Sequence, residues 1–193
     1  ERIITSHGAL IEPGQTLEQR FSLAGAQDKF TLISDARGYR MPQATDPSTH
    51  LMKFETVRHV CFAEYMATQI AGELGLPTIN MTYNTLNQGK ASVPWLKLDR
   101  YDRAQHLGQI VRLHQEDLIQ ALGYPTAYKY EHDGGPDLQA VATLLREVVE
   151  TPLEAIANLR DWQIFNLLIG NWDGHGKNLA LLYPLGSDVP VLA

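Results

Sequence analysis

The spacing of apolar residues changes about halfway along this 193-residue chain, and that change limits the folds open to it. In the first half, short apolar runs separated by turn residues predict strands at 30–33, 49–54, 79–86 and 91–98, the last two as a hairpin. Between them, apolar residues at every fourth position in 57–74 predict an amphipathic helix packed on a core. The positions predicted to face that core are Phe62, Met66, Ile70 and Leu74, joined by Ala63, Ala67 and Ala71.

The second half has helical spacing instead. It predicts helices at 113–122, 138–149 and 153–169, and Thr151-Pro152 gives the last one a cap followed by proline at its first position. A strand-rich part followed by a helical part is an α+β organisation. Polar clusters near the junction are typical of an enzyme with a cleft.

Composition narrows the class of protein further. With 22 acidic and 16 basic residues, the net charge of −6 gives no overall attraction for nucleic acid. The single cysteine, Cys61, cannot form an internal disulfide, and its apolar helical surroundings predict a buried thiol. The sequence has no signal-peptide pattern and no apolar window of membrane-spanning length, so we expect a cytoplasmic protein. Because the chain opens with Glu1 and stops where a strand begins, we interpret it as a fragment of something longer.

The densest polar cluster lies at 171–178, directly after an apolar helix and before an apolar strand. It contains Asp173, His175, Lys177 and Asn178. An Asp followed five residues later by Asn is the spacing of the protein-kinase catalytic loop, where the Asp accepts the substrate hydroxyl proton and the Asn holds magnesium. The alternative is a turn in which Asp and Asn only cap backbone groups and the His lies on the surface.

A second cluster, 22–29, combines small residues with a bend before a strand. Such a segment allows backbone N–H groups to approach phosphate oxygens closely. It matches neither the P-loop nor the dinucleotide-binding glycine pattern, and an ordinary β-turn is the alternative.

Two further features of the sequence are candidates for a nucleotide-binding site. Lys53 lies in a predicted strand and Glu64 in the helix after it, which is how kinases direct an ammonium group at ATP phosphates. A solvated lysine and a solvated glutamate are the alternative. The polar stretch 98–103 follows an apolar strand and is either a hinge beside a nucleotide or an exposed strand end with ion pairs. The polar stretches 112–117 and 129–136 cannot be assigned by spacing, but the order of the other parts is that of a bilobal phosphotransferase.

With these residues in view, the chain resembles the HipA family of serine/threonine-protein kinase toxins from about Arg20 to Ala193. Four segments are close to family signatures and occur in the family's order: 22–29, 112–117, 129–136 and 168–178. The resemblance implies an α+β, bilobal protein-kinase-like fold, related to HipA and the phosphatidylinositol kinases, with a β-rich N-lobe and a truncated helical C-lobe. It divides the chain into a remnant of an N-terminal region (1–19), a β-rich nucleotide-binding lobe (20–103) and an incomplete helical catalytic lobe (104–193).

The resemblance also implies roles for individual residues. Asp173 corresponds to the catalytic aspartate, Asn178 to a magnesium ligand, and His175 and Lys177 to positions in the same catalytic loop. Residues that correspond to ATP-binding positions are Ser22, Ala24, Gly25, Ala26, Gln27 and Lys29 in the phosphate loop, Lys53 at the phosphates, and Asp99 and Tyr101 at the adenine hinge. Ser22 corresponds to the serine that these kinases autophosphorylate.

The function implied is that of an ATP- and Mg²⁺-dependent serine/threonine-protein kinase of a type II toxin–antitoxin system. Its target would be a protein, such as an aminoacyl-tRNA synthetase, and its partner a HipB-like antitoxin through which alone it meets DNA; no membrane is involved. The family's second magnesium-binding aspartate, in a Tyr-Asp motif, is absent, so we expect these 193 residues alone to be inactive and poorly stable. The alternatives are a small-molecule kinase of related fold and a pseudokinase that binds nucleotide or antitoxin without catalysis.

Overall fold

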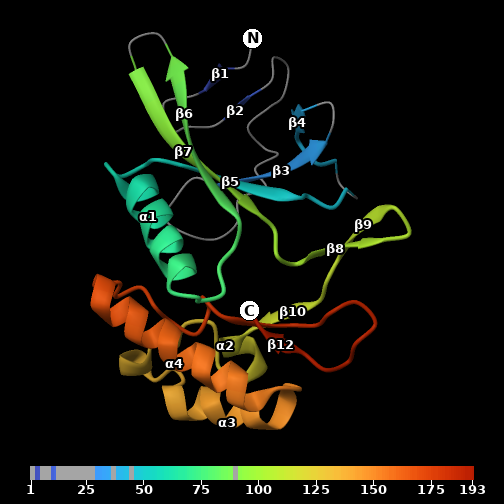
Figure 1. The fold of residues 1–193 in the computed structure, drawn as a ribbon, viewed down its shortest axis with the longest axis vertical. Helices are drawn as coiled ribbons and strands as arrows, with labels where there is room; N and C mark the ends of the chain where they lie inside the picture. Colours follow the sequence, from blue (N-terminus) through green and yellow to red (C-terminus); the bar gives the residue numbers. More distant parts are fainter. Residues whose placement is uncertain (1–2, 5–9, 12–28, 36–37, 44–45, 89–90) are drawn as a thin grey trace. The chain divides into compact units, whose positions relative to one another are not determined.

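The computed structural model describes residues 3–4, 10–11, 29–35, 38–43, 46–88 and 91–193. The chain divides into two compact units (Figure 1), of which the first comprises 1–72 with 78–101 and the second 73–77 with 102–193. Below, these are the first and second units, and each is described by itself.

The first unit is built on a five-stranded antiparallel sheet in the order β4-β3-β5-β7-β6. Its strands are β3 (Lys29–Asp35), β4 (Gly38–Arg40), β5 (His50–Phe54), β6 (Met81–Gln88) and β7 (Ala91–Asp99). A separate pair is formed by β1 (Ile3–Ile4) and β2 (Leu10–Ile11). The four strands predicted from the sequence are therefore confirmed, including the β6–β7 hairpin, whereas β4 was not predicted.

Helix α1 (Val60–Glu73) forms where a helix was predicted, but the prediction that its large apolar residues are buried was wrong. Cys61 and Ala71 are the buried residues of the helix, and Cys61 packs with Met81, Leu96 and Leu98 of the sheet. The four large residues of the predicted face are exposed instead, with Phe62 at 49%, and only Ala71 of that face is buried. Apolar residues occur on more than one side of this helix, so their period alone does not select the side that packs. Burial raises the pKa of the Cys61 thiol to about 11, as expected for an inert, buried cysteine.

The second unit contains more β structure than its sequence predicts. β8 (Arg103–His106) and β9 (Gln109–Arg112) form a hairpin whose two turn residues, Leu107 and Gly108, both have positive φ. That is the geometry of the tight hairpin turn whose twist matches the strands. Leucine is an unusual residue at such a position, which is why the hairpin was not predicted.

The predicted helix at 113–122 was also wrong. β10 (Gln115–Asp117) pairs with β11 (Ala180–Leu182), and β12 (Val191–Leu192) completes that sheet. Only α2 (Leu118–Ala121) is helical there. The Asp117 side chain accepts from the Gln120 N–H, and the Gln120 side chain accepts from the Asp117 N–H. This capping box starts the helix at Leu118, later than the apolar period indicated.

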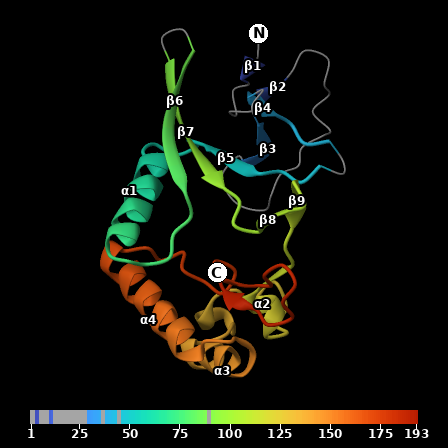
Figure 2. The ribbon, with the colours of Figure 1, turned by 45° about the vertical axis from the view of Figure 1, so that its right-hand side comes forward.

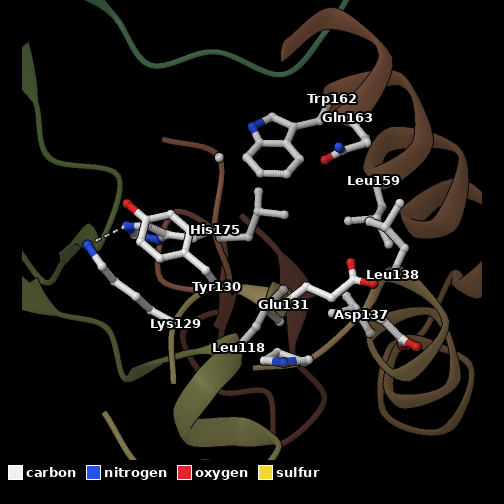
Figure 3. Close-up of a pocket in the computed structure, with 15 residues that line it drawn as sticks. Leu118, Lys129, Tyr130, Glu131, Asp137, Leu138, Leu159, Trp162, Gln163 and His175 are labelled. Atoms are coloured by element: carbon white, nitrogen blue, oxygen red, sulfur yellow. Dashed lines mark hydrogen bonds between the residues drawn. The ribbon is translucent and has the colours of Figure 1, made fainter. Parts of the chain in front are cut away.

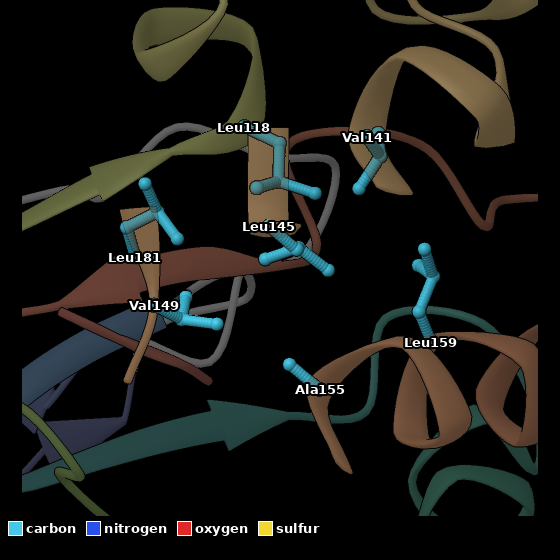
Figure 4. Close-up of a cluster of buried hydrophobic side chains, with 7 residues drawn as sticks. All are labelled: Leu118, Val141, Leu145, Val149, Ala155, Leu159 and Leu181. Atoms are coloured by element: carbon cyan, nitrogen blue, oxygen red, sulfur yellow. The ribbon is translucent and has the colours of Figure 1, made fainter. Parts of the chain in front are cut away.

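Helices α3 (Leu138–Val148) and α4 (Pro152–Ile169) confirm the other two helical predictions and lie side by side (Figures 1 and 2). Thr151 is the N-cap of α4 with proline after it, although its side chain makes no capping hydrogen bond. The core between the elements of the second unit is apolar (Figure 4) and consists of Leu118, Val141, Leu145, Val149, Ala155, Leu159 and Leu181. Within the described residues, no helix combines the length and apolar character needed to cross a membrane.

Candidate functional site

The polar loop, residues 171–178, is held at both ends in the second unit. Helix α4 stops at Gly170, whose φ of 68° is left-handed and whose N–H donates to the last turn of the helix. Asn171 then donates its backbone N–H to the Asn166 carbonyl and its side-chain amide to Asn166 Oδ1, both at 2.8 Å. β11 begins two residues after the loop ends. The loop is thus anchored between a helix and a strand, as the sequence predicts.

Side chains of the loop bind the loop's own backbone. Asn171 Oδ1 accepts from the Asp173 N–H at 3.2 Å, and Asn178 Oδ1 accepts from the His175 N–H at 3.0 Å. His175 Nδ1 accepts from the Lys177 N–H at 3.2 Å. Asn178 therefore does cap backbone, as the turn alternative requires. The Asp173 side chain instead is 72% exposed and accepts from the Tyr130 hydroxyl.

The side chain of His175 is only 10% exposed, in contrast to the 72% of Asp173. Burial lowers the pKa of His175, and the nearby positive charge of Lys129 lowers it further. A neutral ring has one donor and one acceptor nitrogen. Because Nδ1 accepts from the Lys177 N–H, the proton is assigned to Nε2, which lies 3.7 Å from Asp173 Oδ1. The 3.5 Å contact between Nε2 and Lys129 Nζ then joins two donors, so we interpret it as a contact rather than a hydrogen bond.

The segment 129–136, which spacing could not assign, packs against the polar loop. The Tyr130 hydroxyl donates to Asp173 Oδ1 at 2.6 Å, and its ring meets the His175 ring edge-on with centroids 5.1 Å apart. The Gly176 N–H donates to the Lys129 carbonyl at 3.3 Å. Figure 3 shows Lys129, Tyr130 and His175 grouped together. Sequence reasoning missed Tyr130 as a site residue, and the density of polar residues around it was the only available signal.

A pocket of about 120 Å³ opens beside the polar loop (Figure 3). Its walls include Tyr130 and His175 on one side and Trp162 and Gln163 of α4 on the other. That volume is below the roughly 300–1,000 Å³ of ordinary small-molecule sites. The pocket can take a side chain or water, but it is too small for a nucleotide.

In the first unit, Lys53 and Glu64 form the predicted pair. Alternation along β5 puts Met52 and Phe54 in one apolar cluster and Leu51 in the other, against α1. Lys53 shares the face of Leu51, and its ammonium is hydrogen-bonded to the Glu64 carboxylate from α1. Both side chains are mostly buried, so this is a fixed ion pair and not two solvated residues.

The remaining predicted ATP-binding residues are placed as follows. Lys29 begins β3 and lies opposite Lys53 in the strand register, and Tyr101 is exposed. Asp99 ends β7, where its carboxylate accepts from Asn80 Nδ2 at 2.8 Å and lies 3.0 Å from His50 Nε2. The Asp99 side chain is thus engaged within the first unit. Ser22, Ala24, Gly25, Ala26 and Gln27 lie outside the described residues.

Asn178 offers one oxygen to a magnesium ion. Its Oδ1 uses one lone pair on the His175 N–H, and a carbonyl-type oxygen has a second. Mg²⁺ is commonly held by one or two protein oxygens together with phosphate and water, so a single amide ligand fits. Within the described residues, no group of three or more His, Cys, Asp or Glu side chains could hold a metal ion.

Gly176 supports the polar loop by its lack of a side chain. A Cβ at this position would lie 2.7 Å from Ile119 Cδ1, and Ile119 is fully buried. We expect Gly176→Ala to cost about 1–3 kcal/mol in the free energy of unfolding, because the side chain it meets has little space to move. Adding Ile119→Val removes the clashing Cδ1 atom. The double variant should therefore be less destabilised in urea unfolding than the two single changes summed, whereas simple additivity would contradict this packing.

Comparisons with known proteins identify the family to which the chain belongs. The family model for the HipA-like C-terminal domain matches residues 21–193. The Sinorhizobium fredii protein named Putative kinase Y4mE is 38% identical over 167 residues, which cover 85% of this chain and 39% of that protein. The serine/threonine-protein kinase toxin HipA of Shewanella oneidensis is 32% identical over 171 residues, or 82% of this chain and 39% of that protein.

Among solved structures, a chain of the Shewanella oneidensis MR-1 complex of HipA, HipB and operator DNA is similar, with a TM-score of 0.74 and 29% identity. The match covers 89% of this chain and 42% of that one. The chain thus spans about two fifths of the length of the curated relatives it matches.

Proposed function

Because the chain belongs to the family of HipA-like C-terminal domains and has their bilobal, protein-kinase-like α+β fold, we propose that the protein is an ATP-dependent serine/threonine-protein kinase of a type II toxin–antitoxin system. The observation that carries the proposal is the polar loop: an exposed Asp173 carboxylate held by Tyr130, five residues before an Asn178 that is folded back on the loop. An Asp followed five residues later by Asn is the spacing that protein kinases use for a base and a magnesium ligand in phosphoryl transfer to a hydroxyl.

The proposed reaction follows from these groups. The oxygen of a serine or threonine hydroxyl attacks the γ-phosphorus of ATP. The bond between the γ-phosphorus and the oxygen that bridges it to the β-phosphorus breaks, and ADP leaves. Asp173 accepts the hydroxyl proton, which its exposed carboxylate is free to meet. Asn178 would hold a magnesium ion, whose chemistry is to neutralise charge on the β- and γ-phosphate oxygens.

Lys53 supplies the positive charge for the α- and β-phosphates in this proposal. Its ion pair with Glu64 fixes a flexible ammonium group in one place, which reduces the entropy lost when a phosphate binds. Lys29 lies on the neighbouring strand, and Ser22 to Gln27 precede it in the sequence. By family resemblance we assign these residues to the phosphate loop and Ser22 to autophosphorylation, and Asp99 and Tyr101 to the adenine hinge. His175 and Lys177 shape the catalytic loop.

The proposed target is a protein, with an aminoacyl-tRNA synthetase as the family precedent. The proposed restraining partner is a HipB-like antitoxin, and the solved relative that contains HipA, HipB and operator DNA supports that pairing. With a net charge of −6, the chain would meet DNA through the antitoxin and not directly. Cytoplasmic localisation remains a prediction.

Lys53→Met should weaken binding of Mg-ATP by the full-length protein roughly 10- to 100-fold, the value of a hydrogen bond to a charged group. Methionine keeps the length of the side chain and removes its charge. Lys97→Met is the matched control, because Lys97 lies opposite Met52 in the register and so on the other face of the sheet. The dissociation constants come from isothermal titration calorimetry. Equal affinities for the two variants would remove Lys53 from the nucleotide site.

The same samples separate a kinase from a pseudokinase. A kinase binds Mg-ATP and releases ADP when a hydroxyl acceptor is present, and Lys53→Met should weaken the binding and slow the release. Tight binding without ADP release, under conditions in which Lys97→Met behaves identically to the unmodified protein, would favour the pseudokinase instead.

A further inference from the structure

The Asp173 carboxylate is held at one oxygen and open at the other. Its side chain is 72% exposed, so packing alone does not fix its orientation. The Tyr130 hydroxyl donates to Oδ1 at 2.6 Å, and His175 Nε2 lies 3.7 Å from the same oxygen. Within the described part of the chain, Oδ2 accepts no hydrogen bond. One oxygen therefore faces the protein and the other is left for a ligand.

Tyr130 is itself held in place from several sides. Its ring lies edge-on to His175 and is stacked on His132, with centroids 5.1 and 5.3 Å apart. The Lys129 ammonium lies 4.7 Å from the ring centroid. The Tyr130 carbonyl accepts from the Gly135 N–H at 2.9 Å, in a turn where a Cβ on Gly135 would lie 2.7 Å from that carbonyl oxygen. A hydroxyl on so constrained a ring defines a fixed point for Oδ1.

We propose that Tyr130 is a positioning residue for phosphoryl transfer: it binds Oδ1 of Asp173 and thereby presents Oδ2 to the acceptor hydroxyl. This inference rests on the proposed kinase function. A general base must lie within hydrogen-bond reach of the proton it accepts, and a carboxylate has lone pairs enough to accept from two donors at once. Tyr130 remains a donor throughout, while the proton of the acceptor passes to Oδ2. The acceptor hydroxyl thus need not displace Tyr130.

The geometry also gives a role to the segment 129–136. Its Tyr130 lies 43 residues before Asp173 in the sequence. The Lys129 carbonyl accepts a hydrogen bond from the Gly176 N–H, and the Tyr130 hydroxyl donates one to Asp173. The segment joins the polar loop at two points, one on each side of His175. A tyrosine that served only to fill space would not need to place its hydroxyl on an exposed carboxylate.

The test is Tyr130→Phe in the full-length protein, with Tyr128→Phe as the matched control. Phenylalanine keeps the ring contacts and removes the hydroxyl, and Tyr128 is an exposed tyrosine of the adjoining chain. We expect kcat to fall roughly 10- to 100-fold in Tyr130→Phe, the worth of a hydrogen bond to a charged group, with KM for ATP within about twofold of normal. Tyr128→Phe should leave kcat unchanged.

A double-mutant cycle separates positioning from general support of the fold. In an Asp173→Asn background, Tyr130→Phe should lower the residual rate by less than about twofold, because residues that act as a unit are not additive. A full additional loss in that background would overturn the inference, as would an unchanged kcat in Tyr130→Phe alone. An unchanged kcat in Tyr130→Phe would leave the kinase proposal standing, because the unmodified protein would still convert ATP to ADP.

Hydrogen exchange of the polar loop gives a readout that does not depend on turnover. If Tyr130 holds Asp173, backbone amides at 171–178 should exchange several-fold faster in Tyr130→Phe than in Tyr128→Phe. Equal exchange in the two variants would overturn the inference, whether or not the protein transfers phosphate. A lack of phosphotransfer activity would by itself count only against the proposed function.

Discussion

Asp173→Asn should reduce ATP turnover by the full-length protein roughly 10²- to 10⁴-fold, which is the usual contribution of a positioned general base. Asparagine has the shape of aspartate, and its amide cannot accept the proton of the acceptor hydroxyl. The affinity for Mg-ATP should stay within about twofold, since the proposed phosphate contacts come from other residues. The initial rate of ADP release at saturating Mg-ATP measures the loss.

The control for that change is Asp161→Asn. Asp161 is a carboxylate on α4 that pairs with the neighbouring Arg160 and is 47% exposed, outside the polar loop. An exposed pair of this kind contributes little to stability. Asp161→Asn should therefore keep the normal rate. If Asp173→Asn kept more than a tenth of that rate, Asp173 would not be the base.

The largest expected effect on stability comes from Leu145→Ala. Leu145 is 0% exposed and lies in the middle of the second unit's core, with Val141 and Val149 one turn away on either side (Figure 4). Truncation of a leucine in such a place removes apolar contacts and leaves a cavity, at a cost of about 2–5 kcal/mol. Urea unfolding of the full-length protein, followed by tryptophan fluorescence, measures the loss.

Leu138→Ala is the comparison on the same helix. Leu138 begins α3 and is 43% exposed, so fewer of its contacts are lost on truncation. Its cost should be less than half that of Leu145→Ala. Equal destabilisation by the two changes would mean that the core of the second unit is not centred on Leu145.

The parts of the fold that follow from local pattern were predicted. Strands β5 to β7 have apolar runs bounded by turn residues, α3 has a helical apolar period, and α4 begins at the pair Thr151-Pro152. The errors arose where tertiary pairing decides the structure. Gln115 to Asp117 form a strand because Ala180 to Leu182 pair with them, and no local signal reveals a partner that far away.

The site residues also divide into those that local sequence predicts and those that only tertiary contacts bring together. The polar loop and the pairing of Lys53 with Glu64 could be predicted, because each depends on residues close in the sequence. Tyr130 could not be predicted, because it meets Asp173 only when the chain returns 43 residues later. The exposed stripe on α1 has a related cause: a helix with apolar residues on several sides does not reveal which side packs.

The central claim is that the protein transfers phosphate from ATP to a serine or threonine with Asp173 as the base. The most direct measurement incubates the full-length protein, alone and with an extract of its own cells, with Mg²⁺ and γ-³²P-labelled ATP, and identifies acid-stable phosphoamino acids. The account predicts labelled phosphoserine or phosphothreonine, with Ser22 as the first site to map, and no label with Asp173→Asn. Bound nucleotide with no label above the Asp173→Asn background would contradict it.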